Sequence, residues 1–373
     1  MSINRIRHVI TTIERGGAEK QLLVLVKEQV RAGVEVEVFY LKGESDLLFE
    51  FSKIGASVRS DLVKKNFLKQ VLIFTRIYKK DRVFTHAHLP KSELLCAFSC
   101  ERKQFIFSRH NAEPFWPKAP KIISRIFSRF VAARASKAIA ISVAVREYLV
   151  SSGELSRNYL IDTILYGFDP RQASFEDLKI FSTKLRPDFE NIFNIGTIAR
   201  LVPQKDYPTL FYAFKEVRGQ IPNAQLQIVG EGFLKEQLMK LSVELDIDES
   251  IHWIGKISDI DAFLRSINLF VLASSYEGFG LVLLEAMFAD VPILAANNSA
   301  IPEVLGKDYQ GLFQTGNSQS LANKVIDAYS SPQITSKLIE ELRVRKHLFD
   351  AKSMADKVFD SYISALALSD RQI

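Results

Sequence analysis

Residues 275–287 read SYEGFGLVLLEAM and follow a short apolar run, LFVL, at residues 269–272. The apolar run predicts a buried strand, and the stretch after it predicts a glycine-containing loop and then a helix. In a parallel α/β sheet, such a junction lies at the carboxyl ends of the strands, where ligands bind. Bare glycine backbone, free N–H groups and the positive end of the helix dipole favour a phosphate group at this place.

Two carboxylates in this stretch, Glu277 and Glu285, indicate a ligand with more than phosphate groups. A carboxylate beside a phosphate repels it unless there are hydroxyl groups to bind, and the vicinal hydroxyls of a sugar or ribose can donate to both carboxylate oxygens. The two glutamates, with Gly-Phe-Gly after the first and Glu-Ala-Met at the second, resemble the defining motif of glycosyltransferase family 4, which has the GT-B fold. The resemblance also implies donor-nucleotide contacts from Gly278, Phe279, Gly280 and Leu281.

Short apolar runs alternate with helix-length amphipathic segments along almost the whole chain, which is typical of βαβ units and parallel sheets. One series of predicted strands lies near residues 6–10, 36–41, 83–86, 105–108, 138–141 and 160–165. A second series lies near residues 192–198, 225–229, 251–253, 269–272 and 292–295. This α/β pattern, together with the resemblance, predicts two doubly wound Rossmann-like domains that face a central cleft.

The length of 373 residues exceeds what one hydrophobic core usually serves, so two domains are expected. We expect an N-terminal acceptor-binding domain over residues 1–170 and a C-terminal nucleotide-sugar-binding domain over residues 171–355. Residues 356–373 are expected to form a closing helix, which the GT-B resemblance allows to pack back on the first domain. The boundary follows from Tyr166–Pro170 and from the polar stretch through Arg186-Pro187-Asp188.

Two cationic side chains, Arg200 and Lys205, follow the first predicted strand of the second series, in the sequence IARLVPQKD at residues 198–206. This segment resembles the family's Arg-and-Lys diphosphate clamp. Two positioned cations can stabilise the charge that builds on a leaving phosphate without a metal ion. The resemblance further implies that Glu285 binds the ribose, that Glu277 orients the donor sugar, and that the reaction is a metal-independent transfer with retention of configuration.

Several glycine turns are weaker matches to the same family. Gly230 lies in the turn after the second strand of the later series, and Gly255, Lys256 and Ile257 match the segment whose backbone borders the nucleotide base. Near the start of the chain, Gly16 and Gly17 resemble the glycine loop that faces the cleft. Bare backbone there lets amides approach phosphates. The pattern is not Gly-x-Gly-x-x-Gly, which argues against a dehydrogenase.

Three histidines of the first half are candidates for the sugar and acceptor side. His110 follows a predicted strand and matches the histidine that family members place near the transferred sugar, so a hydrogen bond to a sugar hydroxyl is expected. His86 and His88 point to one face of their strand and are expected to line the acceptor side. A zinc site made by these two with Cys96 and Cys100 is an alternative that the residue types allow. We expect no metal and no cofactor, and reduced cysteines.

Three positions depart from the family pattern. Asp290 and the run Asn298-Ser299-Ala300 stand where glycines are usual, and Tyr166 stands where Asn commonly precedes Gly167. These departures leave the nucleotide site intact in the prediction, but they leave the identity of the sugar open.

Charge is distributed unevenly between the two halves. Residues 1–170 contain 28 Lys and Arg against 17 Asp and Glu, and residues 171–373 contain 21 against 26. The basic first half favours an anionic partner. Residues 62–82 and 115–137 predict basic amphipathic helices of the kind that lie on acidic membranes, although a core-facing helix with a solvated outer face fits the same pattern.

The chain contains no apolar stretch long enough to span a bilayer, and its start lacks the apolar run of a secretory signal. We therefore expect a cytoplasmic protein that is peripheral on the inner face of the membrane. Its expected partners are a UDP- or GDP-sugar donor and a glycan or lipid-linked acceptor of surface-polysaccharide or lipopolysaccharide synthesis, and no nucleic acid. Alternatives are a UDP-sugar epimerase or a phosphorylase-like enzyme of the same fold class, or a basic nucleic-acid-binding protein, although the sequence has no helix-turn-helix, zinc-finger or RNA-recognition signature.

Overall fold

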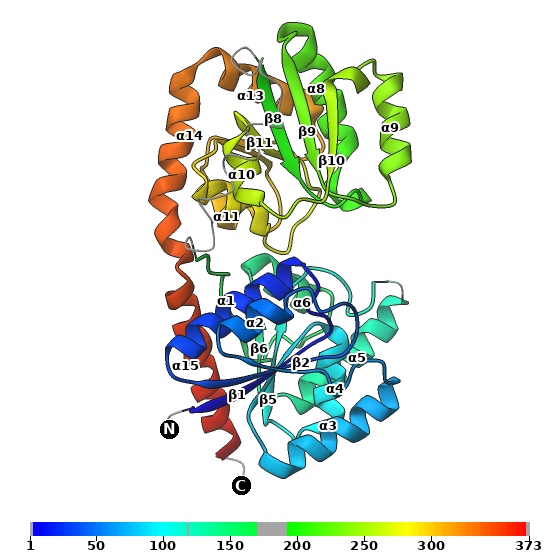
Figure 1. Cartoon of the computed structure of the whole chain (residues 1–373), viewed down its shortest axis with the longest axis vertical. Helices are drawn as coiled ribbons and strands as arrows, with labels where there is room; N and C mark the ends of the chain where they lie inside the picture. Colours follow the sequence, from blue (N-terminus) through cyan, green and yellow to red (C-terminus); the bar gives the residue numbers. More distant parts are fainter. Residues whose placement is uncertain (1–2, 118, 170–191, 371–373) are drawn as a thin grey trace. The chain divides into compact units, whose positions relative to one another are not determined.

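The computed structural model describes residues 3–117, 119–169 and 192–370, which form two compact units (Figure 1). Unit 1 consists of Met1–Asp169 together with Phe349–Ile373, and unit 2 consists of Pro170–Leu348. The polar stretch through Arg186-Pro187-Asp188, where a domain boundary is expected, lies outside the described residues. Within the described ranges, no helix is both long enough and apolar enough to cross a membrane.

Unit 1 is built on a parallel sheet with the strand order β3-β2-β1-β4-β5-β6-β7. Its strands are β1 (Arg5–Ile10), β2 (Glu35–Tyr40), β3 (Ser57–Arg59), β4 (Thr85–His88), β5 (Phe105–Arg109), β6 (Ala138–Ala140) and β7 (Ile161–Thr163). Its helices are α1 (Gly17–Arg31), α2 (Leu48–Lys53), α3 (Phe67–Asp81), α4 (Pro90–Ser99), α5 (Lys121–Arg134), α6 (Val143–Ser151) and α15 (Ala351–Asp370). The sheet is doubly wound, because the chain turns from one direction to the other between β1 and β4.

Unit 2 repeats this plan with the strand order β10-β9-β8-β11-β12-β13, again with parallel pairing. Its strands are β8 (Phe193–Ile198), β9 (Ala224–Val229), β10 (Ile251–Gly255), β11 (Leu269–Leu272), β12 (Ile293–Ala296) and β13 (Leu312–Phe313). Its helices are α8 (Tyr207–Gln220), α9 (Lys235–Glu244), α10 (Ile260–Arg265), α11 (Leu281–Phe288), α12 (Ile301–Leu305), α13 (Ser318–Ser330) and α14 (Pro332–Arg345). Here the winding reverses between β8 and β11.

The last helix, α15, packs against the first helix, α1, although the two lie at opposite ends of the chain (Figure 1). Met354, Val358 and Tyr362 of α15 are part of the hydrophobic core of unit 1. The approach is close at Gly167, where an added Cβ would lie 2.7 Å from the Cα of Ala351. The closing segment therefore starts before residue 356, and it completes the core of the unit in which the chain begins.

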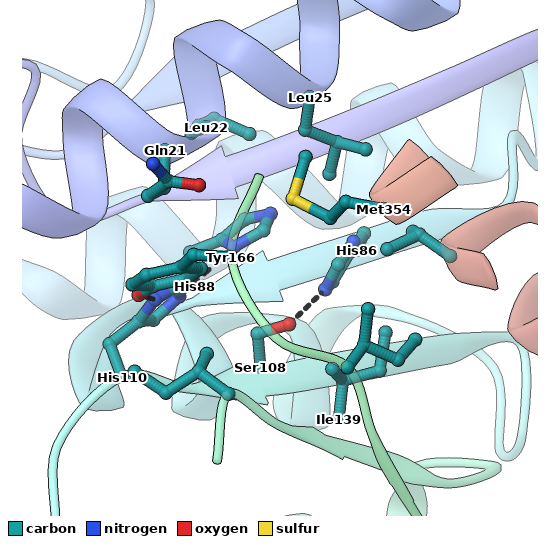
Figure 2. Close-up of a pocket in the computed structure, with 13 residues that line it drawn as sticks. Gln21, Leu22, Leu25, His86, His88, Ser108, His110, Ile139, Tyr166 and Met354 are labelled. Carbon is teal, nitrogen blue, oxygen red and sulfur yellow. Dashed lines mark hydrogen bonds between the residues drawn. The ribbon is translucent and has the colours of Figure 1, made fainter. Parts of the chain in front are cut away.

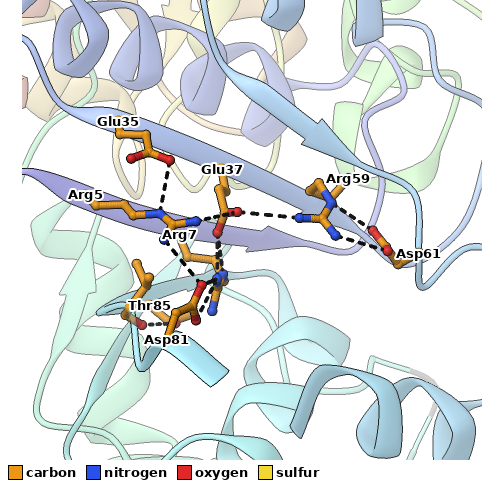
Figure 3. A network of polar contacts seen from close by, with 9 residues as sticks. Arg5, Arg7, Glu35, Glu37, Arg59, Asp61, Asp81 and Thr85 are labelled. Carbon is orange, nitrogen blue, oxygen red and sulfur yellow. Dashed lines mark hydrogen bonds and ion pairs between the residues drawn. The ribbon is translucent and has the colours of Figure 1, made fainter. Parts of the chain in front are cut away.

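A buried arginine, Arg7 of β1, joins β1, β2 and α3 (Figure 3). Its guanidinium donates to Glu37 Oε2 at 2.8 Å and 2.6 Å and to Asp81 Oδ2 at 3.0 Å. It also lies over the rings of Phe39 and Phe74, 5.4 Å and 5.9 Å from their centroids. A charge that is removed from water needs such partners. The loss of Arg7 would leave the buried Glu37 carboxylate with fewer cationic partners and would destabilise unit 1.

We predict that Arg7→Met lowers the free energy of unfolding of unit 1 by about 3 kcal/mol, because Glu37 keeps its desolvation cost and loses its main partner. The chain has two tryptophans, Trp116 in unit 1 and Trp253 in unit 2. Urea unfolding followed by Trp116 fluorescence in a Trp253→Phe background measures unit 1 alone. Arg5→Met is the matched control, since the Arg5 side chain is 35% exposed and the expected loss is at most about 1 kcal/mol. Equal losses for the two variants would contradict the prediction.

Candidate functional site

The site of unit 2 lies where the winding of its sheet reverses. Strand β8 pairs with β9 on one side and with β11 on the other, so the loops that follow β8 and β11 leave the same edge of the sheet as neighbours. The first loop carries Arg200 and Lys205, and the second carries Glu277. Lys205 Nζ donates to Glu277 Oε1 at 2.5 Å, although the residues are 72 positions apart. The structure thus brings together two of the residues expected to bind the donor.

The carboxylate of Glu277 is fixed by more than this ion pair. The residue is 6% exposed, and Oε1 also accepts a hydrogen bond of 2.7 Å from Ser274 Oγ. The backbone N–H of Glu277 donates to Ser299 Oγ at 2.8 Å. A carboxylate that is held at one oxygen and at its own backbone keeps a defined orientation, as a group that must orient a ligand requires.

Backbone hydrogen bonds tie the two site loops to each other. Ser275 N donates to Gln204 O at 2.8 Å, and the Gln204 side chain donates back to Tyr276 O at 2.9 Å. The loop after β8 is joined in turn to the loop after β9, since Leu201 N donates to Glu231 O at 2.9 Å. The loops after three strands therefore form one connected edge.

Two glycines of this edge are required by the backbone itself. Gly230 has φ of +137°, and a Cβ there would lie 2.1 Å from Ala199 O, inside the loop that carries the cations. Gly280 has φ of +85° and precedes the first residue of α11. Side chains other than hydrogen are strained in this region of φ, so these positions favour glycine.

The remaining residues predicted for the donor occupy the same edge with different exposure. Arg200 is exposed on the loop that also carries Lys205, and Glu285 is half-buried in α11. Gly278 and Phe279 are buried, and the half-buried positions are Gly230, Gly255, Ile257, Gly280 and Leu281. Lys256 is exposed and lies 3.5 Å from Glu231.

In unit 1, His86 and His88 lie in the core, and His110 beside them is half-buried (Figure 2). His86 and His88 are 1% and 2% exposed, and they line a cavity of about 30 Å³ together with His110 and Tyr166. The ring nitrogens of His110 lie against the Tyr166 hydroxyl and, at 3.2 Å, against His88 Nδ1. Burial lowers the pKa of His110 to about 3 and that of His8, which lies on the other side of His88, to about 4, so both rings are neutral near pH 7.

The zinc alternative of His86, His88, Cys96 and Cys100 is wrong. Cys96 lies near Arg7, and Arg7 and His8 alternate along β1, so their side chains point to opposite faces of the sheet. The histidines bond to one another on the His8 face. Among the described residues, His8, His86 and His88 are the group whose ligand atoms lie within 4.8 Å of one another, and hydrogen bonds already engage these rings.

Two family models match the chain: "Glycosyltransferase Family 4" over residues 15–161 and "Glycosyl transferases group 1" over residues 184–345. The chain belongs to glycosyltransferase family 4. The Staphylococcus aureus capsular polysaccharide biosynthesis glycosyltransferase CapM is 25% identical over 285 residues, which are 71% of each chain. The putative glycosyltransferase EpsD of Bacillus subtilis (strain 168) is 25% identical over 184 residues, 49% of this chain and 48% of EpsD.

Solved structures give the fold of this family 4 glycosyltransferase. The crystal structure of Anabaena HepE in complex with UDP and glucose superposes with a TM-score of 0.82 at 21% identity, and the match covers 96% of this chain and 99% of HepE. The protein therefore has the GT-B fold, as the sequence predicts.

The glycine loop of this glycosyltransferase lies at the start of α1, after β1. Gly16 precedes the first residue of the helix, Gly17, and a Cβ at Gly16 would lie 2.4 Å from Glu19 Oε2. Glu19 is buried and accepts a hydrogen bond of 2.7 Å from Thr12 Oγ1, and burial raises the pKa of its carboxyl. No sequence pattern marks Glu19 as a site residue, because an acid in the first turn of a helix is an ordinary feature.

Two of the departures from the family pattern have left-handed backbone. Asp290 has φ of 58°, and its carboxylate accepts from Lys346 at 2.6 Å and from Arg343 at 3.1 Å. Ser299 has φ of 43°, and its hydroxyl accepts from the Glu277 N–H and donates to Asn298 Oδ1 at 2.9 Å. In both cases a side chain replaces the usual glycine and makes a hydrogen bond that glycine cannot make.

We predict that Gly230→Ala lowers the free energy of unfolding of unit 2 by about 2 to 3 kcal/mol, because the new Cβ meets the Ala199 carbonyl and the backbone keeps a positive φ. Urea unfolding followed by Trp253 in a Trp116→Phe background measures this change. Gly219→Ala is the control: this glycine lies in α8 with nothing within 4 Å of the added Cβ, so a gain of about 0.5 to 1 kcal/mol is expected. A loss below about 0.5 kcal/mol for Gly230→Ala would refute the close approach.

Proposed function

We propose that this glycosyltransferase transfers a hexosyl group from a UDP- or GDP-sugar to a glycan or lipid-linked acceptor of a surface polysaccharide, with retention of configuration and without a metal ion. The observation that carries the proposal is the contact of Lys205 with Glu277 at the reversal point of the unit 2 sheet. A cation for phosphate and a carboxylate for hydroxyl groups lie side by side there, as a sugar diphosphate demands. The similarity to CapM supports a role in polysaccharide synthesis, and the UDP and glucose bound to HepE support a nucleotide sugar as the donor.

Lys205 and Arg200 bind the diphosphate in this proposal. The ammonium of Lys205 has three N–H donors, and Glu277 Oε1 takes one of them. The other two can reach phosphate oxygens. As the glycosidic bond breaks, negative charge grows on the leaving phosphate, and fixed cations stabilise that charge more than the charge of the intact donor. The two side chains thus supply the charge that a metal ion supplies in other transferases.

Glu277 orients the donor sugar. Both of its side-chain hydrogen bonds from Lys205 and Ser274 go to Oε1, and we assign Oε2 to the sugar hydroxyls. Glu285, in the second turn of α11, is assigned to the ribose, and the backbone around Gly255 to the base. The leaving phosphate oxygen, held next to the reacting carbon by the cations, accepts the proton of the incoming hydroxyl on the same face, which accounts for retention.

We predict that millimolar UDP or GDP raises the Tm of unit 2 in the presence of EDTA, because binding to the folded state stabilises it. Lys205→Met weakens this nucleotide binding about 10-fold to 100-fold, since it removes a charge-assisted hydrogen bond. Glu277→Gln keeps nucleotide affinity within about 3-fold but lowers kcat for transfer about 100-fold, because it disturbs the sugar rather than the diphosphate. Thermal shift and transfer assays with a panel of nucleotide sugars measure these effects.

Lys215→Met is the matched control for the lysine variant. Lys215 is exposed on α8, and its removal should leave nucleotide affinity unchanged. Stabilisation that EDTA abolishes would exclude metal-independent binding. Stabilisation by oligonucleotides, with no response to UDP or GDP, would favour a nucleic-acid-binding protein over a glycosyltransferase donor site.

Unit 1 carries a surface that suits an acidic membrane, and we include this surface in the proposal. Helix α4 packs against both α3 and α5. Its Phe98 ring lies 6.2 Å from that of Phe67 in α3 and 4.9 Å from that of Phe130 in α5, so the three helices share one apolar strip. The exposed apolar side chains on these helices are Leu68, Leu72, Phe98, Ile122, Ile123 and Ile126.

Cations accompany this apolar strip. The exposed basic residues on or beside α3 and α5 are Lys64, Lys65, Lys69, Arg76, Lys79, Lys80, Lys121, Arg125 and Arg129. Apolar side chains flanked by Lys and Arg match the interface of an anionic bilayer, where each cation near the surface contributes about 1 kcal/mol. A place on the inner face of the membrane would bring the enzyme to a lipid-linked acceptor. Lys118, which belongs to the predicted basic segment, lies outside the described residues.

We predict that the double variant Ile122→Gln with Ile126→Gln lowers co-sedimentation with phosphatidylglycerol-containing vesicles at least about 10-fold. The Ile122 and Ile126 side chains are 65% and 60% exposed, and glutamine in their place would not insert into the apolar part of the bilayer interface. Val243→Gln on α9 of unit 2, 63% exposed, is the matched control and should bind as the unaltered protein does. Vesicles of phosphatidylcholine alone test the charge requirement. Unchanged binding by the double variant, or no binding by the unaltered protein at low salt, would refute the membrane surface.

A further inference from the structure

A continuous series of hydrogen bonds crosses the core of unit 1. We call it the histidine chain; its members, in order, are Tyr166, His110, His88, His8, Gln29, Tyr362, His86 and Ser108. Figure 2 shows the part around His86, His88, His110, Ser108 and Tyr166. The five members from His88 to His86 come from β1, β4, α1 and α15, and His110 follows β5, so the histidine chain joins residues from both ends of the sequence.

The Gln29 amide sets the direction of the first half of the histidine chain. Its Nε2 donates to the Tyr362 hydroxyl at 3.1 Å, so its Oε1 accepts from His8 Nε2 at 2.8 Å. A neutral imidazole donates through one nitrogen and accepts through the other. His8 Nδ1 therefore accepts from His88 Nε2 at 3.0 Å, and His88 Nδ1 accepts from His110 Nε2 at 3.2 Å. His110 Nδ1 therefore accepts a hydrogen bond, and the Tyr166 hydroxyl donates it.

The second half follows the same rule. The Tyr362 hydroxyl accepts from Gln29, so its proton goes to His86 Nδ1 at 2.8 Å. His86 Nε2 then donates to Ser108 Oγ at 2.7 Å. All four imidazoles thus carry their proton on Nε2 and none is charged.

Burial makes this arrangement rigid. His8, His86 and His88 are at most 2% exposed, so water cannot replace a bond that is lost. A second proton on one ring would put two N–H groups face to face. Desolvation lowers the pKa of each of the four imidazoles, in agreement with neutral rings.

Tyr166 itself is held in place on several sides. Its ring stacks on that of His110, with centroids 5.9 Å apart and planes at 28°. The next residue, Gly167, accepts a hydrogen bond of 2.9 Å from Gln21 and packs against Ala351 of α15. In this structure the hydroxyl of Tyr166, a residue that is 7% exposed, is held at the His110 ring.

We propose that the histidine chain makes His110 Nδ1 a hydrogen-bond acceptor and leaves the ring no N–H to offer, and that Tyr166 is the positioning residue whose hydroxyl donates to this nitrogen. The role of His110 that follows from this rests on the proposed function. A hydroxyl of the sugar or of the acceptor that reaches this ring must donate its own proton to Nδ1 and take the place of the Tyr166 hydroxyl. His110 then selects hydroxyl groups by accepting from them, and it does not act as an acid.

The test reads the tautomers directly, by long-range ¹H–¹⁵N NMR of the full-length protein with labelled histidine. The chain has six histidines, and His252 and His347 lie outside the histidine chain and serve as internal references. The expected result is the neutral Nε2–H form for all four members between about pH 6 and pH 8. The Nδ1–H form in all four would reverse the Gln29 amide and every bond with it, and would overturn the proposal. A mixed pattern or a charged ring would overturn it as well.

Two tyrosine variants test the role of Tyr166. Tyr166→Phe should shift the His110 resonances, leave those of His86 unchanged, and lower kcat/KM for transfer about 10-fold, with a new dependence on pH as His110 becomes able to gain a proton. Tyr362→Phe is the matched spectroscopic control, since it removes the donor to His86 Nδ1 and should shift His86 first. Tyr166→Phe with an unchanged His110 spectrum, or with unchanged kcat/KM and pH profile, would overturn the proposal.

The failure of this inference can be told apart from the failure of the proposed function. The NMR measurement needs no substrate, so a wrong tautomer pattern rejects the inference while nucleotide binding by unit 2 stands. Conversely, the absence of any stabilisation by UDP or GDP rejects the proposed donor site, while the tautomer pattern of unit 1 remains a separate observation.

Discussion

Parallel strand pairing is the constraint on which the candidate site depends. Parallel strands all end at the same edge of a sheet, and in unit 2 the winding reverses between β8 and β11. The two loops that leave these strands have no other strand between them. Lys205 and Glu277, 72 positions apart, therefore meet at this edge. The hydrogen bond that Glu277 accepts from Ser274 and the one that its N–H donates to Ser299 only refine a position that the sheet already imposes.

Strands β11 (Leu269–Leu272) and β12 (Ile293–Ala296) were predictable because they are apolar over four residues, and buried parallel strands have this composition. The structure adds two strands that the sequence analysis did not predict, β3 (Ser57–Arg59) and β13 (Leu312–Phe313). Both are edge strands of three and two residues, and β3 contains a serine and an arginine. Such strands form because a neighbouring strand offers free backbone groups, which is a property of the sheet and not of the segment.

The site was predictable only where chemistry follows a local pattern. The glutamates and the cation pair lie in short motifs, so the sequence predicts them as candidate donor-binding residues. Ser299 and Tyr166 act through hydrogen bonds to residues far away in the chain, Glu277 and His110, and no periodicity or spacing marks such partners. The same holds for the burial of His86, since a His-x-His alternation places two rings on one face but does not say whether that face meets solvent or a helix.

The packing of α15 on α1 has a consequence for how the protein is made. During synthesis, residues 1–169 emerge from the ribosome first, but the core of unit 1 lacks Met354, Val358 and Tyr362 until α15 has emerged. Unit 2, encoded between the two pieces, is fully synthesised before that moment. Until α15 emerges, the apolar side chains of α1 that it covers have no partner, and α15 completes the core of unit 1 only after unit 2 has been synthesised.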